Sequence, residues 1–318
     1  MLLLNNLRYC YYWISPLIVF IVLCIPLISF FYLYDLDRGF EFSKYITSIT
    51  FFSFYQSIIS ALLSIIIGVV FAYLLFKHNY IYGLKLLINS LSILFVLPTI
   101  ITIFGILTFY GNFFQIYGLF GILIGHVILN IPLVARVIFQ TLNDISPNER
   151  MLADQMSLNS WGSFLAIEWP VIKKNIPSLF VLISFICFVS FTPVLILGGG
   201  PKYSTLEVAI YHAVMFADNF NIAFNLLIVQ ILICGLIYFI FFKNFKSKNF
   251  IIDDQRYYRS INSISYKYII DYLLLIIISV FIFSPITFVL IKGINIKLPE
   301  VLNSFYFWSS LSTTFVIG

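Results

Sequence analysis

The segment MLADQMSLNSWGSFLAIEWP, residues 151–170, is a polar interruption in a chain that is otherwise largely apolar. Asp154, Gln155, Ser157 and Asn159 lie within it, and apolar runs precede and follow it. Over its 318 residues the chain is 61% hydrophobic and only 10% charged, with a mean hydropathy of +1.03. A soluble domain keeps about a quarter of its residues charged, so these values indicate a membrane protein with a polar loop at 151–170.

The apolar runs predict an all-α membrane protein, a polytopic bundle of transmembrane helices, because a helix needs about 20 apolar residues to cross the hydrocarbon. The first run is too long for the apolar core of a signal peptide and has no small-residue cleavage site after it, so we expect it to stay in the membrane. Spans are expected near residues 12–34, 54–76, 86–110, 116–139, 176–197, 223–242 and 268–292, and an eighth begins near 304 and is cut short at Gly318.

The lysines and arginines predict the orientation, because these residues are retained on the cytoplasmic side of a membrane. With a cytoplasmic N-terminus, the segments that face inward carry most of the 18 Lys and Arg residues, and loop 151–170 faces the cytoplasm. The net charge of +5 follows from the same asymmetry. It indicates contact with lipid headgroups and requires no nucleic-acid partner.

A weak internal repeat suggests how the chain is divided. SALLSIIIG at 60–68 is similar to SLSTTFVIG at 310–318, and the spans around Pro26 and Pro285 agree loosely. Short apolar matches also arise by chance, so chance similarity stays an alternative. If the repeat is genuine, residues 1–242 form a first half with a cytoplasmic loop at about 144–170, residues 243–267 form a basic cytoplasmic linker, and residues 268–318 begin a truncated second half.

Several positions inside the expected spans break the apolar pattern. Pro98 and Thr99 interrupt the third span, and Asn130 and Pro132 lie in the fourth. Polar groups in lipid normally face a bundle interior or an aqueous path, so Pro98, Asn130 and Pro132 are candidates for a pathway, with helix packing as the alternative. The glycines at 105, 121 and 125 allow helices to approach closely.

The sequence offers no set of residues for catalysis or for metal binding. Its cysteines and histidines are scattered singly without ligand spacing. A phosphate-binding loop of the Gly-x-x-x-x-Gly-Lys-Ser/Thr type is also missing, so we expect no ATP hydrolysis by this chain, no cofactor and no enzymatic activity.

The polar loop itself predicts two short helices. Ser146 and Glu149 have the spacing of a capping box, with Pro147 at the first helical position. Apolar and polar residues then recur at intervals of three and four. Asn159 or Ser160 can cap a second helix, which Pro170 is expected to end because proline lacks a backbone donor. Such a helix pair either lies in the lipid headgroups or docks a soluble partner, and its periodicity favours neither alternative.

The same loop resembles the cytoplasmic loop of ABC importer permeases, whose pattern is Glu-Ala-Ala, three residues, Gly, nine residues, Ile-x-Leu-Pro. Ala153, Ile167 and Pro170 match it. Met151, Ser157 and Trp169 depart from it, since they stand where the pattern has Glu, Gly and Leu. The longer run MLADQMSLNSWGSFLAIEWPVIKKNIP, together with LGGGPKYSTLEVAIYHAV at 197–214, resembles the thiamine transporter permeases, and the likeness extends over most of residues 50–240.

This resemblance implies a transport subunit of the inner membrane that moves thiamine or its phosphate esters into the cytoplasm. The implied partners are a separate ABC ATPase subunit, as a dimer, and a periplasmic substrate-binding protein. The implied coupling residues are Met151, Leu152, Ala153, Asp154, Ser157, Leu158, Trp161, Phe164, Ile167, Trp169 and Pro170. The implied outer gate or binding-protein contact comprises Gly198, Gly199, Gly200, Pro201, Thr205 and Glu207.

Two alternatives stay open at the level of the sequence. Permeases for iron(III) or another small substrate share the Gly-Gly-Gly-Pro segment, and an ion-coupled secondary transporter is the alternative from another class. Permeases of the resembled type carry two halves, each with its own loop. We therefore expect the chain to be either a fragment of a longer protein or a truncated gene product.

Overall fold

The structure is a computed structural model, and it describes residues 43–78, 82–244, 267–294 and 298–317, with six residues between 21 and 29. The expected first span at 12–34 and the expected linker at 243–267 lie almost entirely outside the described residues. Within them every regular element is helical. Five helices are long and apolar enough to cross a membrane, or six if the bent pair α3 and α4 forms one span.

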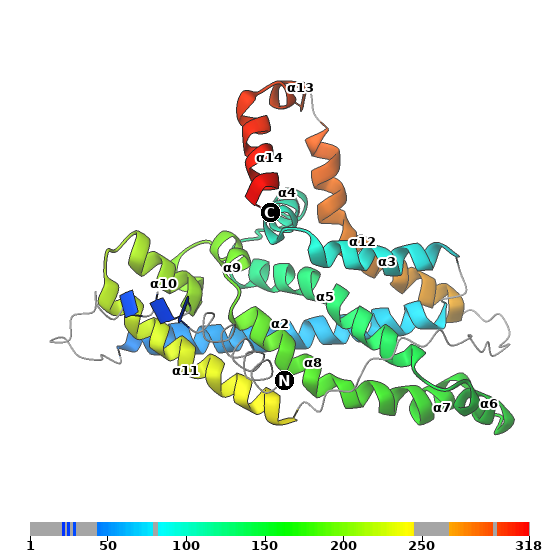
Figure 1. Ribbon diagram of the computed structural model, residues 1–318. Helices are drawn as coiled ribbons and strands as arrows, with labels where there is room; N and C mark the ends of the chain where they lie inside the picture. Colours follow the sequence, from blue (N-terminus) through cyan, green and yellow to red (C-terminus); the bar gives the residue numbers. More distant parts are fainter. Residues whose placement is uncertain are drawn as a thin grey trace, which may run out of the picture.

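The elements follow one another along the chain as shown in Figure 1. They are α2 (Lys44–Lys77), α3 (Tyr82–Val96), α4 (Thr99–Tyr110), α5 (Leu119–Asn143), α6 (Pro147–Gln155), α7 (Ser160–Ser163), a π-helical turn (Phe164–Glu168), α8 (Trp169–Phe188), α9 (Thr192–Leu197), a 3-10 turn (Pro201–Tyr203), α10 (Leu206–Met215), α11 (Phe220–Asn244), α12 (Lys267–Gly293), α13 (Leu298–Leu302) and α14 (Phe305–Ile317).

Helices α2, α5 and α8 form the centre of the bundle and run side by side in Figure 1. Their shared core contains Leu75, Ile131 and Ile138, which are fully buried. The closest approach is at Gly68 of α2, where a Cβ atom would lie 2.6 Å from the Cβ of Val134. Small residues at such a crossing let two backbones come together, which is how helices gain packing energy in lipid.

Helix α2 begins at Lys44, well before the start near residue 54 that hydropathy predicts. The side chain of Ser43 caps it by accepting a hydrogen bond from the amide of Ile46 at 3.3 Å. In its first turns Thr50 and Ser53 donate to backbone carbonyls one turn earlier, each at 2.8 Å. A hydroxyl that bonds its own helix hides its polarity, which is why an apolar window misses this part of the helix.

Pro170 does not end a helix, contrary to the sequence prediction. One continuous helical segment, Trp161–Phe188, runs through it and is a candidate span. The reason is the π-helical turn that precedes α8, in which the amide of Trp169 bonds the carbonyl of Phe164. This wider turn places Pro170 in the first turn of α8, where a missing donor costs little.

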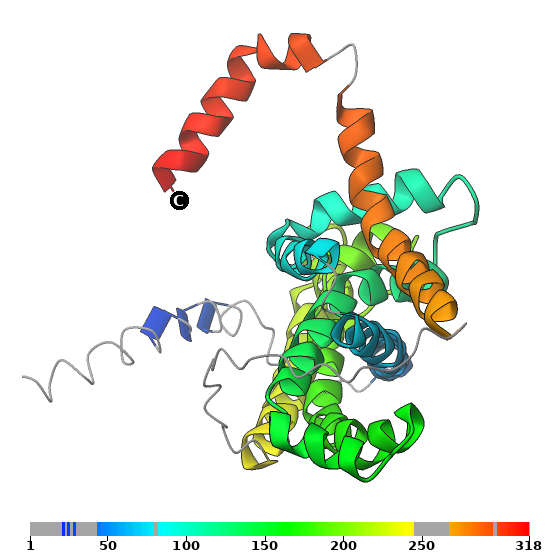
Figure 2. The same ribbon diagram turned by 90° about the vertical axis from the view of Figure 1, so that its right-hand side faces the viewer.

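The third expected span is interrupted at Pro98, as predicted, and the two pieces α3 and α4 meet at a sharp bend. A second interruption at Val189–Phe191 separates α8 from α9. Beyond it, Figure 2 shows α13 and α14 standing away from the rest of the bundle, with α12 as the connection. Helix α14 has 13 residues, none of them buried.

Candidate functional site

Helix α6 begins as the capping pattern predicts. The Ser146 side chain accepts a hydrogen bond from the amide of Asn148 at 3.2 Å, and Pro147 occupies the first turn. The helix buries a single described side chain of the expected coupling set, Ala153, which is 4% exposed. Because its remaining surface faces outward, α6 is held by its N-terminal cap and by one small contact, and it projects from the end of the bundle in Figure 1.

The turn between α6 and α7 depends on an unusual backbone conformation at Ser157. Its φ is +52°, in the left-handed region that L-residues other than Gly, Asn and Asp seldom adopt. This is the position at which the family pattern has Gly, so the pattern reflects a backbone requirement that Ser157 meets under strain. The side chain of Asn159 then accepts from the amide of Gly162 at 2.7 Å, so Asn159 is the predicted cap of the second helix.

Phe164 connects this helix pair to the bundle. Its ring meets the ring of Tyr73 on α2 edge to face, with centroids 4.9 Å apart. Trp161 stacks on the other side at 5.4 Å, and Trp169 lies 6.1 Å away. Edge and stacked aromatic pairs of this kind add about 0.5–1.5 kcal/mol each beyond burial. Phe164 therefore braces the loop, while Trp161 is 67% exposed and adds only its inner face to the brace.

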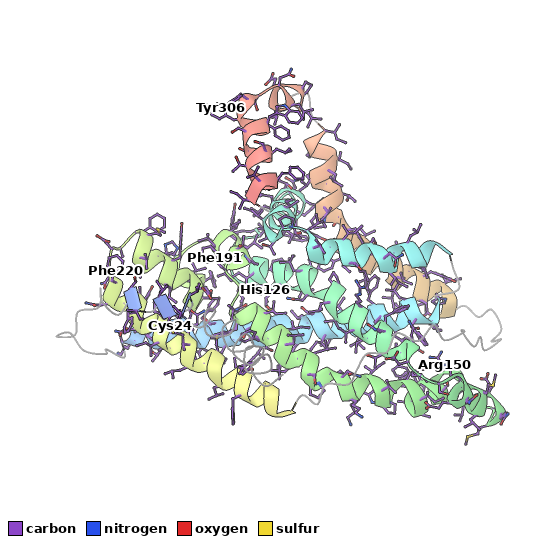
Figure 3. The ribbon with its side chains drawn as sticks, viewed as in Figure 1. Cys24, His126, Arg150, Phe191, Phe220 and Tyr306 are labelled. Atoms are coloured by element: carbon purple, nitrogen blue, oxygen red, sulfur yellow. The ribbon has the colours of Figure 1, made fainter. Side chains whose placement is uncertain are left out.

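Arg150 makes a second connection, which the sequence analysis did not identify. Its guanidinium lies 4.4 Å from the ring centroid of Phe76 on α2, and it donates to the carbonyl of Leu142 at the end of α5 at 3.0 Å. Figure 3 shows Arg150 where the loop meets the bundle. The loop is thus tied to α2 and α5 at the same end, so a push on α6 is transmitted to both.

The outward face of the loop is apolar at its centre and polar beside it. Met151, Leu152 and Trp161 are exposed, and Asp154 and Ser157 lie exposed among them. Met156, absent from the expected set, is 71% exposed and belongs to the same face. Its place could have been found from its three- and four-residue spacing to Leu152 and Asn159. Leu158 and Ile167 are half-buried, and Trp169 and Pro170 are exposed.

The expected outer segment forms a tight turn between α9 and α10, as predicted. Gly199 and Gly200 have φ values of +70° and +131°, so both need glycine, and Pro201 starts the short 3-10 turn. Thr205 caps α10 and is buried. Glu207 accepts a hydrogen bond from the side-chain amide of Gln230 on α11. Gly199, Gly200 and Pro201 are exposed, which leaves the turn itself open to contact.

The three candidates for a pathway are not brought together. Pro98 lies exposed at the bend between α3 and α4, while Asn130 and Pro132 are buried in α5. The Asn130 amide donates to the carbonyl of His126 at 2.8 Å and to the sulfur of Cys187 at 3.3 Å. In this arrangement Asn130 joins α5 to α8, which is the packing alternative, and a role in a pathway stays a prediction.

His126 joins three parts of the bundle. One ring nitrogen lies 3.1 Å from the Ser60 hydroxyl of α2, and the other lies 2.6 Å from the Ser190 hydroxyl at the break before α9. His126 is 1% exposed and is seen inside the bundle in Figure 3. The two nitrogens are used by hydroxyls, and no group of three His, Cys, Asp or Glu side chains in the described ranges could hold a metal ion.

Comparison with known proteins gives close relatives for most of the chain. It is 35% identical to the thiamine transport system permease protein ThiP of Haemophilus influenzae over 298 residues, which are 88% of this chain and 55% of the relative. It is 32% identical to ThiP of Escherichia coli, covering 86% of this chain and 54% of that protein. Similarity to ThiP of Brucella abortus, at 32% identity, covers 57% of this chain.

The chain therefore spans about half the length of the curated relatives it matches. No family model matches it.

Proposed function

We propose that this chain, which is homologous to the ThiP permeases over most of its length, is the membrane-spanning permease part of an ATP-driven importer that carries thiamine or its phosphate esters into the cytoplasm. The observation that carries the proposal is the similarity over 86–88% of the chain to proteins named as thiamine transport permeases. We propose about eight spans in the inner membrane, with the N-terminus in the cytoplasm, because most lysines and arginines then face inward.

The loop 144–170 is the proposed docking site for an ATPase dimer. An apolar patch made of Met151, Leu152 and Trp161 suits a hydrophobic groove on a soluble partner, as helix-in-groove recognition requires. The braces at Phe164 and Arg150 support this role, since a docking element transmits motion only if it is fixed to the helices that must move. Closure of the ATPase would move the loop and the bundle as rigid bodies.

The turn Gly198–Pro201 with Thr205 and Glu207 is the proposed contact for the substrate-binding protein, or the outer gate. Its glycines leave the backbone exposed, and the turn is fixed from below by a hydrogen bond from the amide of Gly118 to the carbonyl of Leu197 at 2.8 Å. Rigid support beneath an exposed turn is what a receptor surface needs. The division of the chain into a first half at 1–242 and the start of a second at 268–318 belongs to the same proposal.

Thiamine uptake in the cell that makes this protein tests the proposal. The codons are changed at the chromosomal locus, so the protein is examined as the cell makes it. We expect that deletion abolishes uptake of labelled thiamine, and that uptake stops when ATP is depleted but continues when ion gradients are collapsed with ATP held constant. Uptake that follows the ion gradient would identify a secondary transporter. Loss of iron(III) uptake with thiamine uptake unchanged would identify the other substrate.

A further inference from the structure

Helix α12 lies against α4 along the outer part of its length, and it changes direction there in Figure 1. Gly105 of α4 faces Pro285 of α12 so closely that a Cβ atom on Gly105 would collide with the Pro285 carbonyl. One turn further, the rings of Phe109 and Phe288 meet at 5.5 Å. Helix α4 thus has a hollow into which the proline of α12 fits.

Pro285 leaves one carbonyl of α12 without its helical partner. A residue in an α-helix donates its amide to the carbonyl four residues earlier, and proline has no amide hydrogen. For Pro285 the carbonyl left over is that of Phe281. Phe281 stands at the centre of the candidate span Ile269–Gly293, where a lipid bilayer offers no water as a replacement donor.

Tyr110, the last residue of α4, supplies the missing hydrogen bond. Its hydroxyl donates to the carbonyl of Phe281 at 3.0 Å. The same hydroxyl lies 3.1 Å from the hydroxyl of Ser284, which is 9% exposed. Since the single hydroxyl hydrogen of Tyr110 goes to the carbonyl, Ser284 donates to Tyr110. The result is a chain of two bonds in one direction, in which each bond strengthens the other.

We infer that Tyr110 is a positioning residue that replaces the amide lost at Pro285, and that Gly105 and Tyr110 together form a socket on α4 that fixes the bend of α12. The inference does not depend on what the protein transports. One consequence rests on the proposed division of the chain: because α12 would begin the second half, the socket would join the two halves at mid-membrane.

A double-mutant cycle between Tyr110 and Pro285 tests this role in the full chain, purified in detergent. Tyr110→Phe removes the hydroxyl alone, and we expect it to lower the melting temperature by about 2–4 °C. Pro285→Ala restores the amide, so the carbonyl of Phe281 regains its helical partner. In the Pro285→Ala background the same Tyr110→Phe change should lower the melting temperature by less than about 1 °C. Tyr55→Phe, an exposed tyrosine on α2, is the matched control and should change nothing.

Equal losses from Tyr110→Phe in both backgrounds would overturn the inference, because the hydroxyl would then act independently of the missing amide. No loss in the Pro285 background would overturn it as well. If the Pro285→Ala protein cannot be recovered, the cycle is run between Tyr110→Phe and Ser284→Ala. The chain of bonds requires the double variant to lose less than the two single losses added together, and additive losses would contradict it.

The steric half of the socket has its own pair of variants. Gly105→Ala places a Cβ against the backbone of Pro285 and should lower the melting temperature by at least as much as Tyr110→Phe. Gly235→Ala on α11, where an added Cβ meets nothing within 4 Å, is the control and should leave the melting temperature unchanged or raise it. Equal behaviour of the two glycine variants would show that α12 does not need the hollow at Gly105.

Discussion

Ser157 illustrates how one backbone angle can constrain a loop. The turn from α6 to α7 needs a left-handed residue at this point, and Ser157 adopts φ +52° to provide it. The strain in such a position is about 1–3 kcal/mol for a residue with a Cβ. The family pattern has Gly here, and the geometry gives the reason.

We predict that Ser157→Gly raises the stability by about 0.5–1 kcal/mol, because glycine adopts this angle without strain. Ser157→Val should lower it by a similar or larger amount, since a β-branched residue fits this region worst. Thermal melts of the purified chain measure both. Met156→Val, next to Ser157 but at an ordinary φ of −75°, is the control for a bulky exposed change. Equal effects of the two valine variants would contradict the assignment.

His126 has the second prediction at this scale. Replacing it by Ala removes the hydrogen-bond partner of the Ser60 and Ser190 hydroxyls and leaves a cavity at a fully buried site. We expect a loss of about 2–4 kcal/mol in stability, with His126→Gln losing less because an amide can bond at least one hydroxyl. His212→Ala, at an exposed histidine of α10, should stay within about 0.5 kcal/mol of the unchanged protein. A similar, small loss at both histidines would show that the three-helix joint contributes little.

At the scale of elements, the helix pair α6 and α7 separates two roles that neighbouring aromatic residues could otherwise share. Phe164 faces inward to Tyr73, and Trp161 faces outward with 67% of its surface exposed. The former should fix the loop, and the latter should contact whatever docks on it.

Phe164→Ala should therefore loosen the loop without unfolding the bundle. We expect amide hydrogen exchange over residues 147–163 to become at least tenfold faster, because losing the brace costs about 1.5–3 kcal/mol of local stability. Exchange in the middle of α2 should not change. Trp161→Ala should leave exchange almost unaltered but weaken capture of the importer's ATPase subunit. If Phe164→Ala accelerates exchange no more than Trp161→Ala does, Phe164 is not the brace.

At the scale of the whole molecule, two ties hold α12 to the preceding helices. One is the socket at Tyr110 and Gly105. The other is at the opposite end, where Asp271 of α12 lies 2.7 Å from the ammonium of Lys77 and 3.2 Å from the ring of His78. The ring of Tyr272 lies 4.7 Å from that of His78 and completes the surroundings. This end of the molecule therefore contains a titratable joint between α2 and α12.

Burial lowers the pKa of His78 below its usual value of about 6.5, while its hydrogen bond to Asp271 acts in the opposite direction and Lys77 lowers the pKa further. The unfolded chain thus binds a proton at a higher pH than the folded chain does. The contribution of His78 to stability is complete above pH about 6.5 and is lost as the pH falls toward the lowered pKa.

We expect the melting temperature to fall between pH 7 and pH 5.5, and His78→Gln to flatten this part of the curve. Melts across a pH series check the effect, with His212→Gln, at the exposed histidine, as the control that keeps the slope. An unchanged slope in His78→Gln would assign the acid sensitivity to other groups.

Composition and local chemistry were sufficient to predict much of this protein. A chain that is 61% hydrophobic must be helical in lipid, since helices satisfy every backbone group internally, and the caps at Ser146 and Asn159 depend only on neighbouring residues. The tight turn after α9 is equally local. These features need no knowledge of the rest of the fold, because donors, acceptors and glycines lie within a few residues of one another.

Contacts between distant segments were decided only by the tertiary structure. The continuation of the helix through Pro170 depends on the π-helical turn before it, and the braces at Phe164 and Arg150 depend on α2 lying alongside. His126 looks isolated in the sequence, yet it joins Ser60 and Ser190 from two other segments. Tyr110 meets Phe281 across 171 positions of sequence. No pattern in one helix specifies which donor on another will reach it, so only the packing of the helices determines these partners.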